Sequence, residues 1–249
     1  MVSGMEYPWD LLPLWEGRPV YKGMTGSHAF GVNTAESDFD YFCVWVHPLD
    51  HYLGMATLPE SNRHQRELIY QQSKEIPEGK VELVTIDIRH FFLQLYRNRL
   101  QFHKWLWVPS ELVDRKDKHL EDVELDVYTK LVQWRNYMTH HRLMAIGLQQ
   151  SGTHALRTAL KPEPNTRDVQ RGYQELAFLH AVLAGSHLRL NARARQTVRQ
   201  IKEGYRLTSL DLEDIMVAPC RVQHMVQRPL IGWWDRLLVE LIRKVYDEQ

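Results

Sequence analysis

The chain of 249 residues is 44% hydrophobic and 25% charged, ordinary proportions for a globular protein that buries a core of its own. These values exclude a disordered tail, a collagen-like fibre and a small disulfide-stapled scaffold. Lys and Arg together number 31, as do Asp and Glu, so the formal net charge is zero. A wholly basic nucleic-acid binder is therefore excluded, although a local basic face is not.

The first 115 positions alternate between short β-rich runs and turn residues. Strands are predicted at residues 20–25, 38–46, 68–72 and 81–86. A helix is predicted at 89–107, because apolar residues from Phe92 to Leu100 recur at helical spacing. This half of the chain is typical of an α/β domain.

The remainder of the sequence has mostly helical periodicity. Helices are predicted at residues 127–148, 173–188 and 192–204, in a short segment after Ser209, and from Pro229 onward. The predicted fold is α/β (α+β), with a small mixed sheet flanked by helices and followed by a helical region. We place a catalytic-type domain at residues 1–115 and a helical domain at 116–249, and we expect the active cleft between them.

Cysteine content and hydropathy predict the compartment. Cys43 and Cys220 are too few for an all-cysteine zinc site, and the apolar run around Cys43 predicts a buried, reduced thiol. Residues 1–14 have no basic-then-apolar leader pattern, and no run reaches the roughly 18 apolar residues of a membrane span. We therefore expect a cytoplasmic protein without a membrane segment.

One segment has a pattern that predicts chemistry: GSHAFG at residues 26–31, followed by SDFD at 37–40. Gly26 lets the backbone approach a ligand closely and Ser27 offers a hydroxyl, a combination that suits a phosphate. Asp38 and Asp40 are two apart on a predicted strand, so both carboxylates project from one face. Two carboxylates held so close repel each other, and a divalent hard cation relieves the repulsion.

A two-metal site for phosphoryl displacement needs a third carboxylate. Glu82 lies at the start of the predicted strand at residues 81–86, and Asp87 follows its end, just before a helix. We favour Glu82, because Asp87 is placed to cap that helix. Both assignments stay open at this point.

The order of these motifs resembles the nucleotidyltransferases of the DNA polymerase beta superfamily. The string at residues 26–40 is similar to a bacterial and phage branch associated with RNA repair, whose pattern is roughly GSHAYG-x-x-T-x-x-SD-x-D. Residues 48–54 resemble the proline and YLGL segment of that branch, and residues 184–191 and 201–204 resemble its helical tail more weakly. The resemblance spans most of the chain, from about residue 21 to residue 215.

The resemblance implies roles for particular residues. Gly26 and Ser27 match the residues that hold the nucleoside triphosphate, and Asp38 and Asp40 match the two metal-binding acids. Glu82 matches the third acid, which helps to activate the acceptor hydroxyl and is more commonly Asp in the family. For the neighbouring His28, contact with a phosphate and a hydrogen bond within the loop are equally compatible with the sequence.

The function that we predict is metal-dependent transfer of a nucleoside monophosphate from a nucleoside triphosphate, ATP among the candidates, to a hydroxyl acceptor with release of pyrophosphate. Mg²⁺ or Mn²⁺ would serve as the cofactor. The acceptor could be an RNA 3′ end, a protein side chain or a small molecule, and basic residues concentrated between residues 157 and 202 suit RNA as well as a solvated surface. The alternatives are an inactive nucleotide- or RNA-binding module on the same fold and a regulatory partner protein. Base preference and oligomeric state are not specified by the sequence.

Overall fold

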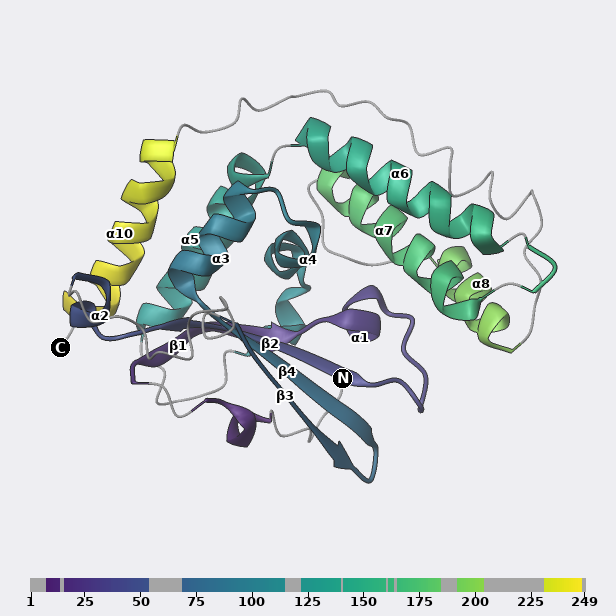
Figure 1. The fold of residues 1–249 in the computed structure, drawn as a ribbon, viewed down its shortest axis with the longest axis horizontal. Helices are drawn as coiled ribbons and strands as arrows, with labels where there is room; N and C mark the ends of the chain where they lie inside the picture. The colour runs from purple at the N-terminus through teal and green to yellow at the C-terminus, as the bar shows by residue number, and fades with distance from the viewer. Residues whose placement is uncertain are drawn as a thin grey trace.

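The structure is a computed structural model, and its helices and strands are shown in chain order in Figure 1. It describes residues 8–13, 16–53, 69–114, 122–139, 141–159, 161–163, 165–184, 192–203 and 231–247. The strands are β1 (Arg18–Met24), β2 (Phe39–Val46), β3 (Ile69–Ile76) and β4 (Gly79–Asp87). The helical elements are η1 (Trp9–Leu11), α1 (Gly26–Phe30), α2 (Leu49–Leu53), α3 (Ile88–Tyr96), α4 (Leu100–His103), η4 (Lys104–Trp107), η5 (Ser110–Leu112), α5 (Asp122–Met138), α6 (His141–Ala159), α7 (Thr166–Ala184), α8 (Ala192–Lys202) and α10 (Ile231–Asp247).

The four strands form one sheet in the order β1-β2-β4-β3. β1 is antiparallel to β2 and β3 is antiparallel to β4, whereas the central β2 and β4 are parallel. This arrangement confirms the predicted small mixed sheet with helices. The parallel pairing sets Asp40 opposite Glu82 and Trp45 opposite Asp87, and so it fixes where the acids of the two strands lie.

Both faces of β2 are buried, which explains its almost continuously apolar sequence. Phe42, Val44 and Val46 join the main core beneath the helices, and Phe42 stacks on Trp105 with 4.9 Å between ring centroids. The alternate residues, Cys43 among them, form a second cluster on the other face. Cys43 is fully buried, as predicted.

Two predicted helices are shorter than expected. The helix predicted at 89–107 ends at Tyr96, because Asn98 takes a left-handed conformation with φ of 57° and the chain turns before α4. That turn lets Trp105 fold back and stack on Phe91 at 5.7 Å. The helix predicted at 127–148 is divided into α5 and α6, and at the break Thr139 Oγ1 donates to the carbonyl of Arg135 (2.7 Å).

The helical half of the chain does not lie in one place. α6 and α7 form a hairpin in which Gly152 and Gly172 face each other, and an ideal Cβ on Gly172 would come within 3.2 Å of the Gly152 carbonyl oxygen. α10 instead returns to the sheet on the side opposite that hairpin, where Tyr246 donates to the His47 carbonyl (Figure 1). Our division of the chain at residues 115 and 116 stays a prediction, and the short helix predicted after Ser209 falls outside the described residues.

None of the helices in the described ranges is both long and apolar enough to cross a bilayer.

Candidate active site

The Gly-Ser motif lies directly against the second aspartate of the acidic motif. The backbone N–H of Thr25 donates to the Asp40 carbonyl (2.7 Å), which joins the end of β1 to the start of β2. Gly26 has φ of +61°, and a Cβ there would lie 1.8 Å from Oδ2 of Asp40. Only glycine therefore fits beside this carboxylate. Residues 26–30, which begin with Gly26 and Ser27, form the short helix α1.

Three acidic side chains lie near the same end of the two central strands, β2 and β4. Asp38 is exposed just before β2, while Asp40 and Glu82 are half-buried. Asp40 and Glu82 are register partners on adjacent parallel strands, so their side chains leave the same face. The structure therefore brings Glu82, which the sequence separates from Asp40 by more than forty positions, next to the acidic motif.

The electrostatics of this cluster are unfavourable for ionised Asp40. Burial, together with the negative charges of Glu82 and Asp38, raises the pKa of Asp40 to about 6. The Lys80 ammonium acts in the opposite direction and lowers that pKa. Lys80 Nζ also forms an ion pair with Oε1 of Glu82.

The oxygen donors of this cluster suit a hard divalent cation such as Mg²⁺ or Mn²⁺. Burial, and after it the charges of Glu82 and Asp38, raises the pKa of Asp40, so a cation beside these acids would favour the ionised carboxylate. Among the described residues, however, no three His, Cys, Asp or Glu side chains already converge as a metal centre. Glu82 is instead paired with Lys80, so it would have to leave that ion pair before it could join Asp38 and Asp40 around a cation.

Asp87, the alternative third acid, has a structural contact set. Its Oδ1 accepts from the backbone N–H groups of Arg89 (2.9 Å) and His90 (3.1 Å), and its Oδ2 accepts from the Tyr52 hydroxyl (2.8 Å). The side chain is fully buried and caps the N-terminus of α3. These contacts occupy both carboxylate oxygens, which leaves Glu82 as the acid beside Asp40.

The two remaining predicted residues lie on α1. Ser27 is buried. The His28 ring stacks on Phe39 with centroids 4.8 Å apart, and burial lowers the pKa of His28, which favours the neutral ring. Its Nε2 has no hydrogen-bond partner among the described residues. This ring nitrogen therefore makes no hydrogen bond within the loop, and the phosphate contact considered for His28 stays a prediction.

The structure places two further basic side chains, Lys80 and Arg195, near these motifs. Lys80 could have been noticed from its spacing, because it precedes Glu82 by two residues on one strand face. Arg195 of α8 lies 3.3 Å, at Cδ, from the position of a Cβ on Gly31, at the end of α1. Nothing local in the sequence distinguishes Arg195 from the other arginines of that helix.

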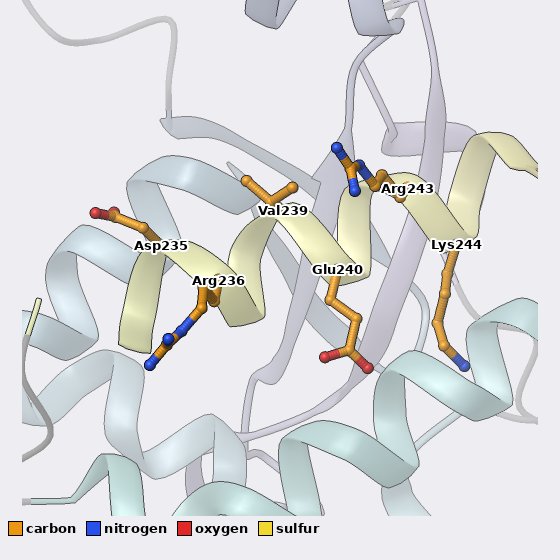
Figure 2. A pocket seen from close by; sticks show the side chains of 6 residues that line it. All are labelled: Asp235, Arg236, Val239, Glu240, Arg243 and Lys244. Atoms are coloured by element: carbon orange, nitrogen blue, oxygen red, sulfur yellow. The ribbon is translucent and has the colours of Figure 1, made fainter. Parts of the chain in front are cut away.

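A surface hollow is lined by side chains of α10 (Figure 2). Its side chains are mostly charged and share no residue with the motifs above; they are Asp235, Arg236, Val239, Glu240, Arg243 and Lys244. It contributes nothing to the site described here.

Comparison with known proteins agrees with the motifs. The family model described as RlaP, the RNA repair pathway DNA polymerase beta family, matches residues 16–189. No curated protein matches the sequence. Among solved structures, a nucleotidyltransferase-like protein from Exiguobacterium sibiricum 255-15 is similar at 11% identity and a TM-score of 0.28, over 94% of this chain and 70% of the other, a likeness too low to carry an argument. The family match spans more than half of the sequence, and the chain therefore belongs to the RNA repair pathway DNA polymerase beta family.

Proposed function

We propose that the protein transfers a nucleoside monophosphate from a nucleoside triphosphate to a hydroxyl acceptor and releases pyrophosphate. Family membership supports a nucleotidyltransferase activity. The observation that supports transfer of a nucleoside monophosphate is the convergence of three sequence motifs. Asp40 is the register partner of Glu82, and the backbone of Gly26 lies against the Asp40 carboxylate.

Each of these residues has a task that follows from its position. Asp38, Asp40 and Glu82 would hold Mg²⁺ or Mn²⁺, which supplies positive charge for the developing charge of the acceptor oxygen and the leaving group. Gly26 and Ser27 would let the triphosphate approach the backbone beside Asp40. Glu82, once apart from Lys80, would accept a hydrogen bond from the acceptor hydroxyl and draw away its proton. Positioning and charge neutralisation then supply most of the rate.

The acceptor that we favour is an RNA 3′ end. The description of the family names an RNA repair pathway, which supports this choice. Arg195 of the basic helix α8 lies near Gly31 at the end of α1, and it offers positive charge to a polyanion there.

Pyrophosphate release from each of the four nucleoside triphosphates tests the proposal. The reactions contain Mg²⁺ or Mn²⁺ and pooled RNA, and they compare wild type with Asp38→Ala/Asp40→Ala. A matched control, Asp10→Ala/Glu240→Ala, removes two carboxylates that pair with Lys74 and Lys130 outside the cluster. We expect release that the control retains and the site variant loses. Equal release from wild type and the site variant would refute the assignment.

The second candidate is a nucleotide-binding module without turnover. It is favoured by one observation, the ion pair that holds Glu82 against Lys80 in place of a preformed three-acid centre. Its signature is metal-dependent binding of a nucleoside triphosphate, measured by calorimetry, with no pyrophosphate release from any acceptor tried.

A further inference from the structure

Lys80 is placed so that one ammonium group acts on all three acids. It precedes Glu82 by two residues on β4, so both side chains project from the same face of the sheet. Lys80 Nζ contacts Oε1 of Glu82. The hydrogen bond and charge of Glu82, and to a smaller extent the charge of Asp38, raise the pKa of Lys80, and the Lys80 ammonium opposes the rise in the pKa of Asp40. The ammonium is thus a cation within the field of the whole cluster.

The ion pair is of a kind that a competing cation can displace. The side chains of Lys80 and Glu82 are 37% and 28% exposed, so water can solvate each of them when they separate. Pairs with this much exposure contribute little net stability. A divalent cation brings two positive charges to the same carboxylates, and its ammonium competitor has one.

We propose that Lys80 is an internal counter-ion, which occupies Glu82 until a divalent cation binds the three acids and which thereby sets the metal affinity of the site. The inference rests on the proposed function, because it requires that these acids hold a metal. It goes further by naming a positioning residue that controls when Glu82 is available.

The test is Mn²⁺ binding by the full chain, measured from the electron paramagnetic resonance signal of free Mn²⁺ without nucleotide. Lys80→Gln removes the competing charge and should bind Mn²⁺ about fivefold to tenfold more tightly than wild type. Lys80→Arg keeps the charge and should stay near wild type. Lys74→Gln is the matched control for net charge: Lys74 pairs with Asp10, and its register partner is Val81, whose side chain lies on the sheet face opposite Lys80 and Glu82. It should leave the affinity unchanged.

Asp40→Asn separates the counter-ion role of Lys80 from the metal site itself. If Asp40→Asn abolishes Mn²⁺ binding while Lys80→Gln binds as wild type does or more weakly, the counter-ion role is wrong and the metal site stands. If Lys74→Gln tightens binding as much as Lys80→Gln, the effect is one of net charge and the counter-ion role is again wrong. If neither wild type nor Lys80→Gln binds Mn²⁺, with both folded by circular dichroism, the inference and the metal site of the proposed function fail together.

Discussion

Ionisation of Asp40 is unfavourable in the folded chain. Its pKa of about 6 lies above the ordinary value of 3.8, so the folded chain favours the protonated acid. Without metal, the contribution of Asp40 to the free energy of unfolding should therefore be most favourable below about pH 4. It should decline as the pH rises to about 6 and remain constant above that. The loss cannot exceed about 3 kcal/mol and is reduced by the partial exposure of the side chain.

Asp40→Asn removes this penalty. In EDTA, we expect the variant to be more stable than wild type above about pH 6 and equally stable near pH 4. Urea denaturation across this range measures the difference in the free energy of unfolding. A difference between the two proteins that does not change with pH would contradict the assignment of the raised pKa to Asp40.

A second prediction for a single residue concerns the substitution of Gly26. In Gly26→Ala the new Cβ would meet Oδ2 of Asp40 at 1.8 Å in a residue with positive φ. The carboxylate has to move, so Mn²⁺ affinity and pyrophosphate release should be lost, while strain costs about 1–2 kcal/mol of stability. Gly147→Ala is the control, since nothing lies within 4 Å of its Cβ position in α6. Unchanged Mn²⁺ binding by Gly26→Ala would show that the close contact is not needed.

At the scale of elements, the two ends of β4 have different tasks. Asp87 caps α3 and accepts from the hydroxyl of the partly buried Tyr52, so Asp87→Ala should cost about 2–4 kcal/mol of stability. The folded fraction should still bind Mn²⁺ like wild type. Glu82→Gln should do the opposite, with a stability change under about 1 kcal/mol and a loss of metal affinity.

Thermal unfolding and Mn²⁺ titration of the two variants decide between these roles. If Asp87→Ala loses metal affinity at a temperature where it is fully folded, Asp87 belongs to the metal site. If Glu82→Gln keeps full affinity, Glu82 does not.

At the scale of the whole molecule, a largely buried ion pair connects the sheet-bearing part of the chain to the α6–α7 hairpin. Lys104 of η4 contacts Glu175 of α7 at 2.7 Å, with side chains that are 18% and 6% exposed. Lys104 also lies over the ring of Phe30, at the end of α1. Removing one partner leaves a buried charge unpaired, so Glu175→Gln should cost about 2–3 kcal/mol.

The matched control is Glu240→Gln, which breaks a more exposed pair with Lys130 and should cost less than about 1 kcal/mol. Urea denaturation compares the two variants with wild type. Equal losses would mean that Glu175 does not contribute through its buried pair.

Features that depend on neighbouring residues could be predicted from the sequence. The spacing of Asp38 and Asp40 predicted two carboxylates at the start of a strand. The apolar run around Cys43 predicted that its thiol is buried. The capping role of Asp87 was predicted from its place between a strand and a helix, and its hydrogen bonds confirm it. Each of these inferences depends only on residues that are close together in the chain.

The remaining features were decided by tertiary structure. Helical periodicity continues past Asn98 and Thr139, yet the chain turns at both, because packing of the following residues outweighs local preference. The pairing of Asp40 with Glu82 depends on β2 and β4 becoming parallel neighbours, and the approach of Arg195 to Gly31 depends on how α8 packs. Motif spacing along the chain was enough to name the candidate site residues and the strand face that Asp38 and Asp40 occupy. Which of them meet was settled only by contacts between distant segments, since these arise from burial of the shared core rather than from spacing along the chain.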